Sequence, residues 1–255
     1  VGLYEKDGQK YAIKSSLNSR TKTDVLINER VKTIELNRKV SERIESIDNL
    51  NLQLYDKLQL KFSCNFVLTY QEIIEDEYDG DLFISEALDT DLFEYVVTVI
   101  DKVPIHQKYN LIKTIICQLI YGIYCLHSLN IIHGDLKMEN ILVKVVNGIP
   151  ILKFADIDGG KLLNFNGDLD NLPADVREDL DTVSGATQDY LPKLLLDTHG
   201  FKAMDGKVYN FTTEKIMPLS DGFRKKLSKE SDIYALGIIC LVIMFQQFPM
   251  TTVDG

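Results

Sequence analysis

The segment Ile131–Asn140 concentrates side chains that could act together on a phosphoryl group. It reads Ile-Ile-His-Gly-Asp-Leu-Lys-Met-Glu-Asn and holds Asp135, Lys137 and Asn140 directly after an apolar, helix-like stretch. A carboxylate can orient and deprotonate an acceptor hydroxyl, a cation offsets charge on the transferring phosphoryl group, and an amide oxygen can hold a metal ion. The residue types and their spacing therefore predict a site of phosphoryl transfer.

A second metal-binding carboxylate should come from a nearby strand, and Asp156 is the candidate. It lies sixteen residues after Asn140, at the end of the apolar run Ile149–Phe154. Asn147-Gly148 joins this run to Ile141–Val146, and Asn-Gly between two apolar runs is the strongest short hairpin signal. We therefore expect Asp156 to follow the second strand of a hairpin and to bind metal together with Asn140.

The first third of the chain is predicted to be rich in strands. A Lys-Asp-Gly turn at its start predicts a hairpin that ends at Lys14, and loosely helical apolar spacing predicts a helix over Asp24–Ile47. Two further strands are expected on either side of an acidic turn, over Phe66–Ile74 and Leu82–Leu88.

After Leu88 the pattern becomes helical. We expect a short helix over Asp91–Ile100 and a long helix opened by Pro104. The long helix has one apolar face, made by Leu111, Ile112, Ile115, Ile116, Leu119, Ile120 and Ile123. The chain from Asp158 to about Glu230 is polar and loop-like. Strands followed by helices predict an α+β fold of two lobes, hinged near Leu88.

Composition sets broad limits on function. The 255 residues are 45% hydrophobic and 26% charged, which is typical of a globular protein, and the net charge is −10. This charge argues against nucleic acid as the main partner, because binding to its phosphates needs a basic surface. The longest apolar run, Ile233–Phe245, falls short of the roughly 20 residues that span a bilayer, so we expect a core helix and no membrane span.

The four cysteines favour a reducing compartment. No CxxC pair occurs, and Cys117, Cys125 and Cys240 lie in apolar helical stretches, where we expect buried free thiols. A cytoplasmic-type location follows, with a secreted or injected effector left open. The chain begins at Val1 without Met or a leader-like segment, so we expect a fragment.

Taken together, these motifs resemble the eukaryotic-type protein kinases. The H-R-D-x-K-x-x-N loop of that family is similar to His133–Asn140, and V-A-I-K is similar to Tyr11–Lys14. The K-x-x-D-F-G run is similar to Lys153–Asp158, and S-D-V-W-S-L-G to Ser231–Gly237. The four elements occur in the family's order and cover nearly the whole chain.

The resemblance implies a two-lobed protein-kinase-like fold, truncated at both ends. Residues 1–88 would form a small β-rich N-lobe with one main helix. Residues 89–255 would form a mostly helical C-lobe with a long activation segment and an insertion at about 194–230.

The resemblance also implies roles for the polar residues, with ATP and Mg²⁺ as cofactors. Lys14 would contact the α- and β-phosphates and be oriented by Glu29, or by Glu35 as the reserve choice. Asp135 would orient the acceptor hydroxyl and Lys137 would lie near the γ-phosphate. Asn140 and Asp156 would hold magnesium.

The adenine site is implied in the same way. Ser85 would be a small gatekeeper, the backbone of Glu86, Ala87 and Leu88 would bond adenine, and Ala12 and Leu142 would enclose its ring. His133 would be a packed core histidine. Asp232 would cap its helix and brace the catalytic loop.

Several positions depart from the family pattern. No G-x-G-x-x-G is present, Gly134 replaces the Arg of H-R-D, and Lys193 replaces the Glu of A-P-E. Ile157 and Asp158 stand where the family has Phe and Gly. Ile157 can still pack as an apolar plug, and in an alternative frame Asp158 would be the metal ligand.

Three functions remain open on the sequence alone. The leading prediction is a divergent serine/threonine kinase acting on a protein substrate. The acidic segment Asp156–Pro192 would favour basic substrate peptides by electrostatic complementarity. A solvated loop that never meets substrate is an equal explanation of that segment. The alternatives are a pseudokinase scaffold and a small-molecule phosphotransferase, in which H-G-D-x-x-x-x-N also occurs. The sequence makes no prediction of the oligomeric state.

Overall fold

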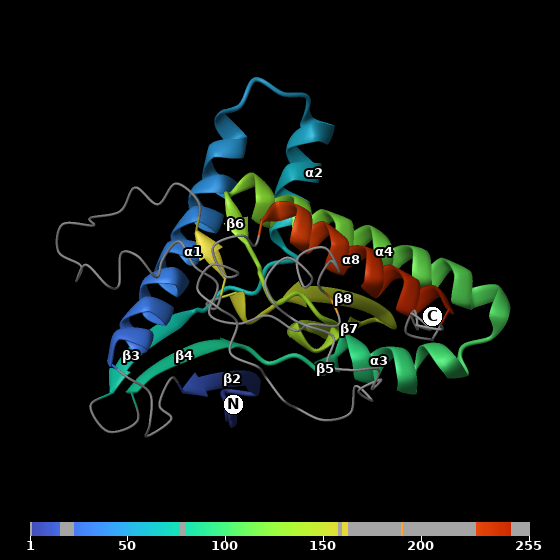
Figure 1. Cartoon of the computed structure of the whole chain (residues 1–255), viewed down its shortest axis with the longest axis horizontal. Coiled ribbons are helices and arrows are strands. Elements are labelled where there is room, and N and C mark those ends of the chain that lie inside the picture. Colours follow the sequence, from blue (N-terminus) through green and yellow to red (C-terminus); the bar gives the residue numbers. More distant parts are fainter. Residues whose placement is uncertain are drawn as a thin grey trace, which may run out of the picture.

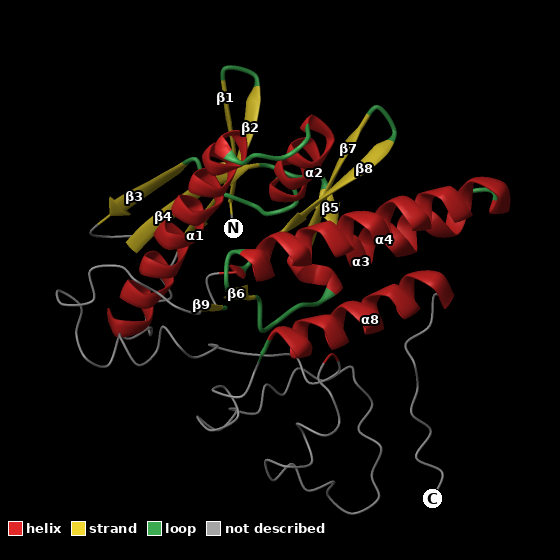
Figure 2. Cartoon of the chain, turned by 90° about the horizontal axis from the view of Figure 1, so that it is seen from above, coloured by secondary structure: helices red, strands yellow, loops and turns green. Residues whose placement is uncertain are grey.

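The structure is a computed structural model that describes residues 2–15, 23–76, 80–157, 160–162, 190 and 228–245. The strands of the first part of the chain form one sheet, and two long helices of the second part, α4 and α8, lie side by side (Figures 1 and 2). This succession of a sheet and then helices is the predicted α+β arrangement. Most of the stretch from Asp158 to Glu230 lies outside the described residues.

The first sheet has four antiparallel strands in the order β1-β2-β4-β3. The strands are β1 (Gly2–Lys6), β2 (Gln9–Ser15), β4 (Gly80–Glu86) and β3 (Glu72–Asp76). Asp7 and Gly8 turn the first hairpin with φ values of 54° and 76°, the left-handed conformation that a tight hairpin turn requires. The predicted hairpin ending at Lys14 is confirmed, and Lys14 lies opposite Phe83 of β4.

Helix α1 (Thr23–Asn49) confirms the predicted helix and extends it by a few residues. Its buried apolar side chains, Leu36, Val40 and Ile47, lie on one face, as a helix packed on a core requires. The sequence analysis did not predict α2 (Leu54–Cys64), which follows after a short turn. The two helices form a hairpin, and α2 returns to pack on α4 (Figure 1).

The predicted strand Phe66–Ile74 is wrong over its first half. Phe66, Val67 and Leu68 are all buried, although alternate residues of a strand should point to opposite faces. This segment makes a single parallel bridge from Val67 to Phe154 and does not join the sheet. The strand itself, β3, begins at Glu72.

The next part of the chain is mostly helical. β5 (Thr90–Asp91) leads into α3 (Leu92–Thr98), and the Asp91 carboxylate accepts a hydrogen bond of 2.8 Å from the Glu94 amide as an N-cap. A 3₁₀ turn, Ile100–Lys102, precedes α4 (Ile105–Ser128), which begins directly after Pro104 as predicted.

The predicted apolar face of α4 needs two corrections. Ile115, Leu119 and Ile123 are buried, but Ile120 is 53% exposed, because it lies beside the buried stripe and no described element covers it. Cys117 is also exposed, whereas Cys125 is buried and Cys240 is half-buried. The buried Cys125 thiol contacts Cys64 of α2 at 3.6 Å, and all four cysteines are free.

Within the described part of the chain, α4 is the one helix that could cross a membrane by length and composition. The prediction of no membrane span rested on the shorter run Ile233–Phe245. A core helix of a globular protein passes the same test, and Ile115, Leu119 and Leu126 are completely buried here against other parts of the chain.

The predicted Asn-Gly hairpin is confirmed at its exact bounds, as β7 (Ile141–Val146) and β8 (Ile149–Phe154). Together with β5 they form a three-stranded sheet, and Phe154 at the end of β8 is completely buried. A 3₁₀ turn (Met138–Asn140) precedes the hairpin, and β6 (Ile131–Ile132) pairs with β9 (Lys161–Leu162) in a separate two-stranded sheet.

The fit between Phe154 and α4 leaves no room for a side chain at Gly122. A Cβ atom there would lie 2.1 Å from Cε2 of the buried Phe154 ring. We therefore expect Gly122→Ala to lower the free energy of unfolding by about 1–3 kcal/mol, the usual cost of overpacking a core. Urea denaturation would measure this loss. Gly237→Ala in α8, where a Cβ meets nothing within 4 Å, is the control, and an equal effect in both variants would contradict the prediction.

Helix α8 (Lys229–Phe245) completes the described core. Ile239 and Ile243 are completely buried, one turn apart, in the same cluster as Leu119 and Leu126 of α4. The prediction of a core helix over the apolar run Ile233–Phe245 is thus correct for one face of α8, while Ile233 itself is 51% exposed.

Candidate active site

Lys14 and Asp156 meet although 142 residues separate them in the sequence. The Lys14 ammonium lies 2.7 Å from a carboxylate oxygen of Asp156. Strand β2 presents the lysine, and Asp156 follows the end of β8. Asp156 has a φ of 58°, a conformation that costs energy for a residue other than glycine and that is concentrated at functional sites.

The catalytic-loop candidates form a second group. The Lys137 ammonium lies 2.9 Å from one carboxylate oxygen of Asp135. The Asn140 amide donates hydrogen bonds to the Asp135 backbone carbonyl at 2.8 Å and to the same carboxylate oxygen at 3.2 Å. The three side chains chosen from their spacing are therefore in direct contact.

The β7–β8 hairpin brings the two groups together. Asn140 precedes β7 and Ala155 follows β8, and the Ala155 amide donates to the Asn140 carbonyl at 2.9 Å. Asp156 is the next residue. The turn of a hairpin fixes which residues face each other, so the Asn-Gly turn at the far end determines that Asp156 lies beside Asn140.

The donor set suits a magnesium ion. Asn140 uses its amide nitrogen on Asp135, and its amide oxygen accepts no hydrogen bond from any residue that the structure describes. Magnesium prefers oxygen ligands and usually takes one or two protein carboxylates or amides besides phosphate and water. Asn140 and Asp156 fit that chemistry. Among the described residues no cluster of three or more acidic, His or Cys side chains could hold a metal ion.

Asp232 braces the catalytic loop from α8. Its buried carboxylate accepts hydrogen bonds from the backbone amides of His133 at 2.8 Å and Gly134 at 3.0 Å. A ring nitrogen of His127 lies 2.9 Å away. The predicted brace is confirmed. The predicted capping role is wrong, because α8 begins at Lys229 and Asp232 already lies within its first turn.

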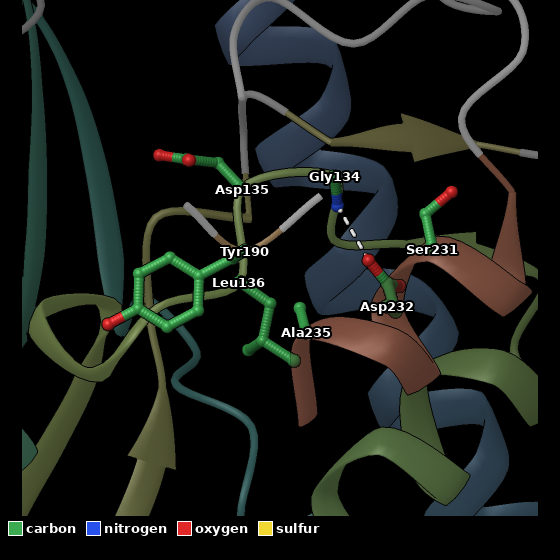
Figure 3. Close-up of a pocket in the computed structure, with 7 residues that line it drawn as sticks. All are labelled: Gly134, Asp135, Leu136, Tyr190, Ser231, Asp232 and Ala235. Carbon is green, nitrogen blue, oxygen red and sulfur yellow. Dashed lines mark hydrogen bonds between the residues drawn. The ribbon is translucent and has the colours of Figure 1, made fainter. Parts of the chain in front are cut away.

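Figure 3 shows the consequence for the loop. The Gly134 amide points to Asp232, whereas the carboxylate of the next residue, Asp135, points away from α8. Gly134 has a φ of 78°, which glycine adopts without strain. A small cavity of about 10 Å³ lies here, lined by Gly134, Asp135, Leu136, Tyr190, Ser231, Asp232 and Ala235.

His133 is completely buried, as predicted for a packed core histidine. Its ring lies edge-on to Phe154 with the ring centroids 6.4 Å apart. Neither ring nitrogen has a hydrogen-bond partner within the described residues. Ile157 is also buried in the core, which agrees with its predicted role as an apolar plug.

The end of β4 and the linker that follows it are tied to the β7–β8 hairpin by contacts that the sequence did not predict. The Glu86 carboxylate lies 2.9 Å from the Lys144 ammonium and 3.4 Å from that of Lys153. The Asp89 amide donates to the Val143 carbonyl at 2.9 Å. The sequence signal for this cluster is one lysine on each strand of the hairpin, Lys144 and Lys153. Whether the two lysines lie on the same side can be predicted only once the register of the hairpin is known.

The ion pairs of Glu86 make a prediction about pH. Burial alone would raise the pKa of Glu86, but the hydrogen bond from Lys144 and the charges of both lysines outweigh it and hold the pKa below the usual 4.5. The stabilisation is then complete above the unfolded-state pKa and is lost as the pH falls through the lower folded-state value. The difference in unfolding free energy between wild type and Glu86→Gln should therefore be constant from pH 6 to 8, within about 0.5 kcal/mol, and shrink below pH 4.5. A difference that grows on acidification would contradict this.

The predicted adenine-site residues lie around the same linker. Ser85 is buried and donates to the Glu86 carbonyl at 3.3 Å. The Ala87 amide donates to the Lys10 carbonyl at 3.2 Å, whereas the Leu88 amide donates to no described residue. Ala12 and Leu142 are half-buried, on β2 and β7. Their contact with adenine remains a prediction.

Two glutamates of α1, Glu29 and Glu35, were the candidates for orienting Lys14. Glu29 lies in α1, but its side chain lies outside what the structure describes. The reserve choice, Glu35, is buried and forms a two-pronged ion pair with Arg38, at 2.6 and 2.7 Å. Asp158, Lys193 and most of the acidic segment from Asp156 to Pro192 also lie outside the described residues.

Comparison with known proteins places most of these site residues inside a known protein family. The protein kinase domain family matches residues 3–192 of this chain. The serine/threonine-protein kinase vps15 of Schizosaccharomyces pombe (strain 972 / ATCC 24843) is 28% identical to it over 142 residues. The aligned stretch covers 56% of this chain and 7% of that protein, so the chain spans only a small part of that relative.

Proposed function

The chain belongs to the protein kinase family, and from this premise we propose that it transfers the γ-phosphoryl group of ATP to a serine or threonine hydroxyl of a protein. The observation that supports this most is the placement of the Lys14–Asp156 pair next to Asn140 and Asp135. Cation, metal-binding oxygens and carboxylate are the groups that phosphoryl transfer requires, and here they come from three separate segments: β2, the catalytic loop and the residues after β8.

Each residue has a distinct part in the proposed reaction. Lys14 contacts the α- and β-phosphates, which compete with Asp156 for its ammonium group. Asn140 and Asp156 hold Mg²⁺, which offsets the charge of the phosphates when bound. Asp135 accepts the proton of the substrate hydroxyl and orients its oxygen. Lys137, which is paired with Asp135, offsets charge on the γ-phosphate.

The proposal extends to adenine and to the substrate. The Leu88 amide and the Glu86 carbonyl bond the adenine edge, and Ala12 and Leu142 enclose its ring. The net charge of −10 favours a basic protein substrate over nucleic acid. The four free cysteines support a reducing, cytoplasmic-type compartment as the place where the protein acts.

Transfer of labelled γ-phosphate from Mg-ATP to a generic basic protein tests the proposal. We expect incorporation with wild type, none with Lys14→Met, and full activity with Lys6→Met, a matched change on the exposed strand β1. Phosphoamino-acid analysis of the product identifies the acceptor residue.

Two results would overturn this function. A thermal shift with Mg-ATP but no turnover on any protein would favour a pseudokinase scaffold. Phosphorylation of hydroxylated metabolites in place of protein would favour a small-molecule phosphotransferase.

A further inference from the structure

The turn between α4 and the catalytic loop controls where Asp135 lies. Leu129 ends α4, with its amide bonded to the carbonyls of Cys125 and Leu126 at 3.1 Å. Asn130 follows with a φ of 59°, and β6 then runs directly into His133 and Gly134. A displacement of this turn would therefore be passed to the catalytic loop within a few residues.

Helix α8 holds this turn from one side. The Lys229 ammonium donates to the His127 carbonyl at 2.5 Å and to the Asn130 side-chain oxygen at 3.2 Å. Asp232 of the same helix binds the His133 and Gly134 amides. Lysine is well suited to the last carbonyls of a helix, which lack partners and carry partial negative charge.

Helix α1 holds the same turn from the other side, through Lys39. The Lys39 ammonium donates to the Leu129 carbonyl at 3.0 Å, across 90 residues of sequence, and its side chain is only 13% exposed. Glu35, one helical turn earlier, lies 3.9 Å from the ammonium group. Burial lowers the pKa of Lys39, which means that the charged ammonium group pays a desolvation cost at this position. The charge of Glu35 acts in the opposite direction.

A second contact of α1 leads toward the first sheet. The Asn37 side chain donates to the Tyr70 carbonyl at 2.9 Å and accepts from the Tyr70 amide at 3.1 Å. Tyr70 lies two residues before the start of β3. Helix α1 is thus fixed to the sheet that carries Lys14 by Asn37 and to the catalytic-loop turn by Lys39, two residues apart on one helix.

We propose that Lys39 is a positioning residue that couples helix α1 to the catalytic loop through the Leu129 carbonyl. It touches no reacting group. It aligns the part of the site carried by α1 and the first sheet with the part carried by Asp135. Its effect on turnover rests on the proposed kinase function, whereas its effect on the order of the loop does not.

Hydrogen exchange and kinetics of Lys39→Met test this coupling. We expect the amides of residues 131–137 to exchange about tenfold faster, the usual effect of losing one hydrogen bond to a charged group. If the chain is an active kinase, kcat should fall by a similar factor while KM for ATP stays within about twofold. Lys39→Arg, which keeps charge and donors, should restore both.

The matched control is Lys57→Met. Lys57 also donates to a backbone carbonyl, that of Asp48 at 2.7 Å, but in the exposed α1–α2 turn. It should leave exchange at 131–137 unchanged. Lys39→Gln ends one atom short of the lysine ammonium and carries no charge, so it weakens the same contact, and it serves if the Met variant does not fold.

Unchanged exchange at residues 131–137 in a folded Lys39→Met or Lys39→Gln variant would overturn the coupling. Faster exchange at these residues in Lys39→Met that persists in Lys39→Arg would also overturn it. If wild type shows no phosphoryl transfer, the proposed function fails, and the exchange measurement still decides the coupling.

Discussion

Asp135→Asn is expected to slow phosphoryl transfer by about 10³-fold, within the range of 10² to 10⁴ for loss of a positioned general base. Asparagine keeps the shape of the side chain and can still meet Lys137, but it cannot accept the proton of the substrate hydroxyl. Affinity for Mg-ATP should change by less than about threefold, since none of the proposed nucleotide contacts is assigned to Asp135. Steady-state kinetics and a nucleotide titration measure the two effects separately.

The control for this variant is Asp48→Asn. Asp48 is a largely exposed carboxylate that pairs with Lys61 at 2.7 Å, remote in the sequence from the catalytic loop. It should keep full activity. If Asp135→Asn retained more than a tenth of wild-type kcat, Asp135 would not be the base, and the assignment of the whole loop would have to be abandoned.

Asp232→Ala is expected to lower the free energy of unfolding by about 3 kcal/mol. The carboxylate is 2% exposed and satisfies the His133 and Gly134 amides as well as His127. Alanine would leave two buried backbone donors without a partner, and each unsatisfied donor costs about 1–3 kcal/mol. Urea denaturation, with the slope of the transition unchanged, would measure the loss.

Asp56→Ala is the matched control for Asp232. Asp56 is also an acidic residue in the first turn of a helix, α2, but it is exposed. Its replacement should change stability by no more than about 0.5 kcal/mol, as for an ordinary surface position. Equal losses in the two variants would show that the helix position, and not the two loop amides, accounts for the effect of Asp232.

Local signals in the sequence were sufficient for much of the site. Asn147-Gly148 fixed a hairpin at its exact bounds, because a two-residue turn leaves only one register. That register brings Asp156 to Asn140. The contact between Lys14 and Asp156 was expected from the family resemblance alone, since no local pattern relates two residues so far apart.

What the sequence did not predict depends on packing between distant elements. Phe66, Val67 and Leu68 are buried where their segment runs beside Phe154. The segment therefore looked like a strand in the sequence, although it makes only a single bridge. Helix α2 has a weakly amphipathic sequence with Leu54 and Leu58 exposed. The pairing of Glu86 with Lys144 and Lys153 needs two strands and a linker to be placed first.

The tight contact between Gly122 and Phe154 restricts which sequences can share this architecture. An aromatic ring at position 154 requires glycine at position 122, and a methyl group at 122 requires a smaller side chain at 154. The two positions should therefore have changed together during divergence, as residues in close contact do. Aligned relatives with alanine at 122 and an aromatic residue at 154 should be missing from the lineage.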